Sequence, residues 1–448
     1  MTGRSFYDRI PSRSDRSWAG TWLSRGSRRA LEDAEAKLYF GWSKRGQKRI
    51  KKIMKGSGRR TRLAALNLRS EWRRWDARER DRAVRATVDV LVVSHLALPG
   101  GNSSAIKEEV RAMRNAGLNV GLLHHPVRGW DISRPLNPKI AEMIDGESVR
   151  LFGSYDDIHA RLTIIRLPTV ALALREDMPR LKSDKTVVVV NQTPFKYYEN
   201  GHGIDQAWDV ASVQRNVSNW LGPHTWFAVG PAVREALETY HADDMREVDL
   251  SDDYWYESID VAAWPMRPHR EVSRPIVIGR HARDHALKWP RDAEQLRSAY
   301  PTADDITVKV LGGSDIPRRR LGSLPAHWED IPFGGMDVRR FLHSLDFMVY
   351  FIDPDAREAF GYAPMEAMAA GVPVVCDSRF RPLFGEAAIY CEPAEVEETV
   401  REFADSVEKY RSQVERAREE VQTRFSYESL LCRLDRLMKR EEVSVSQE

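Results

Sequence analysis

Two carboxylates lie eight positions apart near the C-terminal end of the chain, on either side of a glycine turn. Glu358 precedes Gly361, and Glu366 follows Pro364. Proline suits the first position of a helix, where its missing N–H needs no partner, so the segment predicts a helix that begins at Pro364. The free N–H groups at such a helix end attract anions, including phosphate. We therefore expect an anion site next to carboxylates that can accept hydrogen bonds from neutral hydroxyl groups.

The elements around the two glutamates follow from the same stretch of sequence. Gly371 suits the C-terminal cap of the helix, where a left-handed residue is favoured. Residues 372–375 form an apolar, β-branched run that is typical of a parallel strand covered on both faces. A purely structural interpretation remains open, in which Glu366 complements the helix dipole and Glu358 is a solvated loop acid.

The run from Glu358 to Val375 resembles the Glu-x7-Glu signature of the family 4 (group 1) glycosyltransferases and its Glu-Ala-Met-Ala-x-Gly-x-Pro-Val-Val continuation. The resemblance implies a GT-B fold, an α/β architecture in which two Rossmann-like, doubly wound domains face a cleft. It also implies that Glu358 lies by the donor sugar and that Glu366 holds the ribose of the nucleotide. The loop amides that would face the donor phosphate and sugar are those of Phe360, Gly361, Tyr362 and Ala363.

The first half of the chain predicts one of the two domains, over residues 87–265. An apolar strand at 88–94 is followed by a turn with Gly100 and Gly101, a helix at 103–116 and a second strand at 118–123. Further strands are expected at 161–167, 186–191 and 226–229. By the resemblance, the glycine pair faces the donor or acceptor across the cleft; a plain tight turn is the alternative, because the full dinucleotide-binding spacing is absent.

The second domain is predicted over residues 266–448, after a proline-containing linker. Its sequence alternates strands at 275–280, 306–311 and 346–351 with helices at 290–300 and 338–344, and a closing helix follows at 427–440. Ligands in open α/β sheets bind beyond the carboxyl ends of the strands. Arg280, the pair Gly312 and Gly313, and Glu358 all follow such ends, so we expect these loops to converge on one crevice.

Cleavage of a nucleotide-sugar bond releases a diphosphate, whose charge calls for fixed cations nearby. The resembling family uses an arginine at a strand end and a lysine soon after it. Arg280 matches the arginine and Lys288 is the best match to the lysine, although the interval between them is longer than usual. Arg283, which lies in this interval, is a second candidate for the same task.

One expected residue is missing from the first domain. Many members of the family place a histidine after a middle strand, where this chain has Asn191, Gln192 and Thr193. These side chains offer neutral hydrogen bonds instead. The nearest histidine, His202, lies in a glycine-containing loop, and we do not assign it a catalytic role.

Neither a metal nor another cofactor is expected. Asp353-Pro354-Asp355 has a metal-binding appearance, but a loop turn explains it adequately, and the resembling family replaces the metal with cationic side chains and helix ends. The three cysteines, Cys376, Cys391 and Cys432, lack metal-type spacing and indicate a reducing compartment.

The first 86 residues are strongly basic. They hold 25 of the 69 Lys and Arg but only 9 of the 66 Asp and Glu, a net charge of +16, whereas the remainder carries −13. Tryptophans and other aromatics flank the basic run at 44–60. This composition fits a helical extension that contacts an anionic membrane surface or an anionic acceptor polymer; a solvated arm and, less favoured, nucleic-acid binding remain open.

Together with these features, the resemblance implies a retaining, metal-independent hexosyltransferase that moves a sugar from a nucleotide-diphosphate donor to a hydroxyl acceptor. The acceptor is expected to be a glycan, a lipid-linked sugar or an anionic polymer of the cell envelope. Without an apolar signal core or a run of about 18 apolar residues, a cytoplasmic protein is expected, peripheral on the inner membrane face. The alternatives are a nucleotide-sugar epimerase of the same fold and a catalytically silent nucleotide-sugar-binding module.

Overall fold

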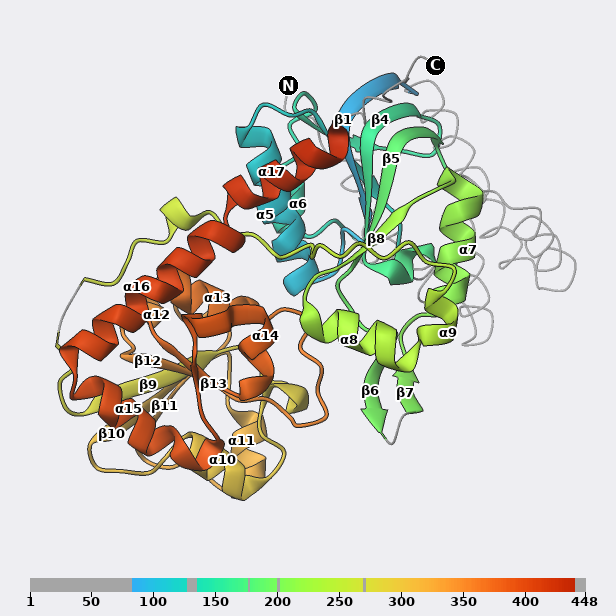
Figure 1. Ribbon diagram of the computed structural model, residues 1–448. Coiled ribbons are helices and arrows are strands. Elements are labelled where there is room, and N and C mark those ends of the chain that lie inside the picture. The colour runs from blue at the N-terminus through green and yellow to red at the C-terminus, as the bar shows by residue number, and fades with distance from the viewer. Residues whose placement is uncertain (1–82, 127–134, 176–177, 200–201, 269–270, 440–448) are drawn as a thin grey trace, which may run out of the picture.

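The computed structural model describes residues 83–126, 135–175, 178–199, 202–268 and 271–439. These residues form two α/β domains, each built on a six-stranded parallel sheet (Figure 1). The predicted basic extension, residues 1–86, lies almost entirely outside the described residues.

The first domain has the strand order β3-β2-β1-β4-β5-β8, with all neighbours parallel. The last five residues of β1 are all buried, as expected for a strand covered on both faces. The strands predicted at 88–94, 118–123, 161–167, 186–191 and 226–229 are confirmed as β1, β2, β4, β5 and β8; β3 was not predicted. The strands are β1 (Arg85–Ser94), β2 (Val120–His124), β3 (Val149–Phe152), β4 (Asp157–Arg166), β5 (Arg180–Val190) and β8 (Thr225–Ala228).

Helices and one hairpin complete this domain. The antiparallel pair β6 and β7 projects below α8 and α9 in Figure 1, and no sequence signal predicted it. His202, for which no catalytic role is predicted, is the exposed first residue of β7. The elements are α5 (Gly101–Asn115), α6 (Pro138–Ala141), β6 (Phe195–Glu199), β7 (His202–Gln206), α7 (Val210–Leu221), α8 (Pro231–Tyr240), α9 (Ala242–Met245) and 3₁₀ turns at Pro168–Ala171 and Val261–Ala263.

The second domain repeats the plan with the order β11-β10-β9-β12-β13-β14. The predicted strands at 275–280, 306–311, 346–351 and 372–375 are confirmed as β9, β10, β12 and β13, whereas β11 and β14 were not predicted. Its strands are β9 (Ile276–His281), β10 (Ile306–Leu311), β11 (Trp328–Ile331), β12 (Phe347–Tyr350), β13 (Val374–Cys376) and β14 (Ile389–Tyr390). Its helices are α10 (Ala293–Ala299), α11 (Asp315–Leu321), α12 (Val338–His343), α13 (Tyr362–Ala369), α14 (Arg381–Phe384), α15 (Val396–Ala404), α16 (Val407–Arg424) and α17 (Tyr427–Met438), with 3₁₀ turns at Ala286–Lys288, Ser378–Phe380, Gly385–Ala387 and Pro393–Glu395.

Helix α13 has the predicted type but begins earlier than predicted. Gly361, with φ 91°, is the N-terminal cap, so the helix starts at Tyr362 and Pro364 occupies the third position rather than the first. The prediction was wrong by two residues because the third N–H of a helix also lacks an internal partner, so proline fits there as well. Gly371, with φ 74°, ends the helix as predicted, and its N–H donates to the Met368 carbonyl.

The last helix crosses back to the first domain. Figure 1 shows α16 over the second domain and α17 beside α5. The side chains of Leu430 and Leu434 in α17 are buried, in agreement with the predicted packing role, and Tyr427 donates a hydrogen bond to Glu108 of α5. None of the helices in the described ranges is long and apolar enough to cross a membrane.

Candidate active site

Lys288 and Glu358 meet where two neighbouring strands of the second domain end. Lys288 follows β9, Glu358 follows β12, and the lysine ammonium forms an ion pair with the Glu358 carboxylate. The hydroxyl of Tyr350 also donates to Glu358, at 3.0 Å. Burial opposes the charge of Lys288, but Tyr350 and Glu358 outweigh it and raise the pKa of the lysine above its usual value. The ammonium is therefore held charged.

The structure places Arg280 beneath this site rather than in it. Its side chain has no exposed surface and stacks 4.1 Å above the Trp289 ring. One guanidinium nitrogen donates to the Tyr300 hydroxyl and to the Phe351 carbonyl, each at 3.1 Å. Successive side chains of a strand point to opposite faces, so Arg280 shares the face of Ile278, which packs in the core cluster with Trp289 and Tyr300. Arg280 is thus enclosed in the core of the second domain.

Arg283 is the exposed cation of the same loop, and it reaches the first domain. Its guanidinium lies 3.5 Å from the position that a Cβ on Gly100 would occupy. Gly100, with φ 99°, caps α5, and no side chain caps the N–H groups of Gly101 and the residues after it. Gly100 therefore faces a cation of the opposite domain, whereas a Cβ on Gly101 would meet nothing within 4 Å.

Gly312 is required by the close packing of two loops. A Cβ there would lie 1.9 Å from the carbonyl oxygen of Ala282, and φ is +125°. The neighbouring Gly313 has φ +99° and lies against Asp284. The carboxylate of Asp284 accepts hydrogen bonds from Trp289 and from the N–H of Ile316. These contacts fix the loop that carries Arg283 and Lys288.

In the predicted donor-facing loop, the side chains of Phe360 and Tyr362 contact other parts of the protein, which leaves the backbone amides for a ligand. The ring of Phe360 is buried among Tyr256, Phe384 and Phe425. Tyr362 donates its hydroxyl to the Ser258 carbonyl, at 3.0 Å. No side chain caps α13, so the amides of its first turn remain available at the end of the sheet.

Glu366 lies within α13, beside a histidine that the sequence analysis did not select. Its carboxylate is 3.4 Å from Nε2 of His281, and its side chain is 22% exposed. Burial raises the pKa of Glu366 to about 8, which Lys139 of α6 partly opposes. Burial, followed by the Arg280 cation, lowers the pKa of His281 to about 4. Both groups are therefore largely neutral at pH 7.

The position of His281 could have been predicted from the alternation of side chains along β9. Ile278 and Arg280 share one face of the strand, so the next residue must point to the other face, toward α12 and α13. The ring of His281 indeed lies 6.3 Å from that of Phe341 in α12. Lys139 carried no signal, because its proximity to Glu366 depends on how the domains face each other.

We expect Glu366 to make stability depend on pH. With a pKa of about 8 in the folded state and the usual lower value in the unfolded state, folding retains a proton. The contribution of Glu366 to the free energy of unfolding is complete below the pKa of the unfolded state. It is lost as the pH rises through the pKa of the folded state. Urea unfolding of the wild type should therefore show decreasing stability from about pH 6 to about pH 8, and Glu366→Gln should flatten this trend. Glu398→Gln, in the exposed first turn of α15, is the control; equal slopes in both variants would contradict the assignment.

In the first domain, Asn191 follows β5 where the histidine was expected. Its amide donates to Asn102 at 2.8 Å, and Asn102 donates to Ser94 at the end of β1. Gln192 instead accepts from Trp208 through its backbone, and the hydroxyl of Thr193 donates to the Phe195 carbonyl. Of the three predicted substitutes, Asn191 is therefore the one connected to the loop of Gly100.

The two aspartates of the Asp353-Pro354-Asp355 turn hold an arginine. Arg291 binds Asp353 at 2.6 Å and Asp355 at 2.5 Å. This arrangement accounts for both carboxylates as parts of a turn fastened to the loop before α10.

Comparisons with known proteins support this architecture. Residues 291–436 match the model of a family described as glycosyl transferase-like. A glycosyltransferase from Rickettsia africae ESF-5 is 13% identical with a TM-score of 0.52, covering 80% of this chain and all of that one. HepE of Anabaena, in complex with UDP and glucose, is 13% identical with a TM-score of 0.50, covering 78% of this chain and 98% of that one.

This chain has a group 1-like GT-B fold. The match to TarM, with a TM-score of 0.44 and 13% identity, covers 63% of this chain and only 55% of the length of TarM. No curated protein matches the sequence. Within the GT-B frame, Lys288, Glu358, Glu366 and the uncapped end of α13 lie at the carboxyl edge of the second sheet, and Gly100 and Lys139 belong to the first domain.

Proposed function

We propose that this chain is a glycosyltransferase that moves a sugar from a nucleoside-diphosphate donor to a hydroxyl acceptor. The observation that carries the proposal is the ion pair between Lys288 and Glu358 beside the uncapped N-terminus of α13. A cation and free N–H groups at one sheet edge suit a diphosphate. The match of residues 291–436 to a glycosyl transferase-like family supports the same activity.

The proposed roles follow from these positions. Lys288 and Arg283 stabilise the charge of the leaving diphosphate, Glu358 orients the donor sugar and Glu366 binds the ribose. As the acceptor oxygen bonds to the anomeric carbon, the bond from that carbon to the phosphate oxygen breaks. The hydroxyl proton leaves with the diphosphate, so a separate enzymic base is not assigned. Retention of configuration and independence from metals are part of the proposal.

A uridine nucleotide is the first donor to test, because HepE and an α-glucosyltransferase with a TM-score of 0.50, 10% identical to this chain, bind UDP. A ligand at about 100 times its Kd adds about 2.7 kcal/mol to the stability of the folded state. We expect such stabilisation from UDP-glucose or a related UDP-sugar in thermal unfolding. Arg283→Ala should weaken donor binding about tenfold, the loss of about 1.4 kcal/mol of charge-assisted contact.

Arg297→Ala is the matched control for Arg283→Ala, because Arg297 is also exposed but lies on α10, away from the cleft loop. It should bind the donor as tightly as the wild type. Equal donor affinity in the Arg283 and Arg297 variants would remove Arg283 from the site. Failure of a full panel of uridine, guanosine, adenosine and thymidine diphosphate sugars to bind the wild type would overturn the proposed function itself.

The cellular setting is proposed from the sequence alone. We place the enzyme in the cytoplasm, on the inner membrane face, where the basic residues 1–86 contact anionic lipid. Sedimentation with anionic vesicles, compared between the full chain and a chain without residues 1–86, checks this placement. Binding that is insensitive to salt and to the deletion would contradict it.

A nucleotide-sugar-binding module without turnover is a second candidate. It is favoured by Asn191, which stands where many transferases have a histidine and donates to Asn102. Donor binding without transfer or hydrolysis would support it. Conversion of the donor sugar without any acceptor would instead indicate an epimerase.

A further inference from the structure

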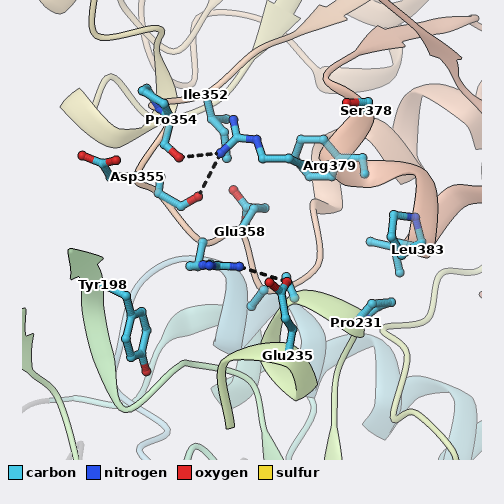
Figure 2. A pocket seen from close by; sticks show the side chains of 16 residues that line it. Tyr198, Pro231, Glu235, Ile352, Pro354, Asp355, Glu358, Ser378, Arg379 and Leu383 are labelled. Carbon is cyan, nitrogen blue, oxygen red and sulfur yellow. Dashed lines mark hydrogen bonds and ion pairs between the residues drawn. The ribbon is translucent and has the colours of Figure 1, made fainter. Parts of the chain in front are cut away.

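A cavity of about 480 Å³ lies between the two domains (Figure 2). Tyr198 of the hairpin and the first turns of α8 form one wall. Residues 352, 354–359, 378–380, 382 and 383 of the second domain form the other. Glu358 lines the cavity and also pairs with Lys288, so the cavity is adjacent to the proposed position of the donor sugar.

The cations that line this cavity already have partners. Arg357 binds Glu235 of α8 at 3.0 Å and also donates to the Tyr240 hydroxyl at 3.2 Å. Arg379 binds Asp377 at 2.9 Å and donates to the Pro354 carbonyl at 2.9 Å. Figure 2 shows Arg379 held at the Pro354 carbonyl. An anion would therefore have to displace an existing partner.

The carboxylates are matched in the same way. Asp355 binds Arg291 at 2.5 Å, Glu358 binds Lys288, and Glu235 binds Arg357. Each charged side chain of the lining already has a partner of opposite charge. A bound cation would therefore gain as little electrostatic attraction as a bound anion. A ligand with hydroxyl groups, in contrast, can donate to the carboxylates and accept from the guanidinium groups without breaking a pair.

Most of the remaining lining is apolar. Ile352, Phe380 and Leu383 are each about 5–6% exposed, and Pro231 and Pro382 lie beside them. Tyr198 is stacked on Tyr240 with 4.2 Å between ring centroids. Apolar surfaces with a few convergent polar groups are typical of small-molecule sites, and they suit the C–H face of a sugar ring.

We propose that this cavity binds an uncharged sugar ring, which we take to be the acceptor. The identification of this ring as the acceptor rests on the proposed function. It narrows the acceptor to a neutral glycan, in place of an anionic polymer. Both domains contribute to the wall of the cavity. Its shape therefore depends on the domain arrangement that brings Arg357 against Glu235.

The test uses the full chain with methyl α-glucoside, methyl β-galactoside and lactose as uncharged probes, and glucuronic acid and glucosamine as charged ones. Saturation-transfer NMR reports binding. Ala232→Trp fills the cavity from the first turn of α8 without removing a charge. Ala242→Trp, an exposed alanine in the first turn of α9, is the matched control. We expect at least one uncharged probe to bind, and Ala232→Trp to weaken it about tenfold or more.

Addition of UDP and of UDP-glucose distinguishes the acceptor from the sugar of the donor. Binding of the probe alongside UDP-glucose supports the acceptor assignment, whereas displacement of the probe by UDP-glucose but not by UDP would assign the cavity to the donor sugar and overturn the acceptor assignment. Absence of binding by all uncharged probes, preference for the charged probes, or equal binding by the two tryptophan variants would overturn the sugar site itself. Thermal stabilisation by UDP in Ala232→Trp separates failure here from failure of the proposed function.

Discussion

Replacement of Lys288 by glutamine is expected to lower sugar transfer by about 10²–10³-fold, the range for removing one preorganised group that stabilises developing charge. Lys288 is held charged by Tyr350 and Glu358, so its position is set before the donor binds. The leaving diphosphate carries more charge on the bridging oxygen in the transition state than in the ground state. The effect should therefore appear mainly in kcat rather than in the KM for the donor.

Lys409→Gln is the control for this result. Lys409 pairs with Glu402 at 2.6 Å on the surface of the second domain, and its side chain is 54% exposed. Initial rates with a radiolabelled donor should be equal in the wild type and the Lys409 variant. If Lys288→Gln also retains wild-type kcat while it remains folded, Lys288 does not act on the leaving group.

The sequence predicted the second domain well because its signals are local. A glycine turn, a helix with Glu366 and a buried strand follow one another within residues 361–376, and each is specified by its own neighbours. The error of two residues at Pro364 concerns only where the helix begins. Short edge strands such as β11 and β14 lacked such a signal, since their residues are few and partly exposed.

The site was less predictable because it depends on which way side chains point and on how domains meet. Arg280 lies near the end of β9 and Arg283 just after it, yet Arg280 is enclosed beside Trp289 and Arg283 reaches Gly100. The alternation of side chains along β9 places Arg280 on the same face as Ile278. It does not by itself show that this face is the one packed against Trp289. The contact of Arg283 with the first domain has no counterpart in the local sequence.

The polar network at the end of β4 leads to the second large expected effect. Arg166 has no exposed surface and pairs with Glu109 of α5 and with Glu257. The Trp255 indole also donates to Glu109, at 2.8 Å. Because Glu257 belongs to the segment that leaves the first domain, the network joins the sheet, α5 and the interdomain connection.

We expect Arg166→Met to destabilise the protein by about 3–5 kcal/mol, the cost of leaving a buried charge without its partner. Arg161→Met is the matched control on the same strand. Arg161 pairs with Asp89 at 3.0 Å but is 48% exposed, so its loss should cost about 1 kcal/mol or less. Urea unfolding followed by tryptophan fluorescence measures both variants, and equal losses would contradict the structural role of Arg166.

The pH dependence of that loss identifies its cause. Burial raises the pKa of Glu257 to about 7 in the wild type, and Arg166 opposes the rise. Without Arg166, Glu257 must take up a proton to remain buried, so its folded-state pKa increases further. The unfolded chain releases this proton at lower pH, and stability is lost as the pH rises toward the folded-state pKa. The difference between Arg166→Met and the wild type should therefore widen from about pH 6 to about pH 8. A difference independent of pH would indicate lost packing of the arginine side chain instead of an uncompensated pair of carboxylates.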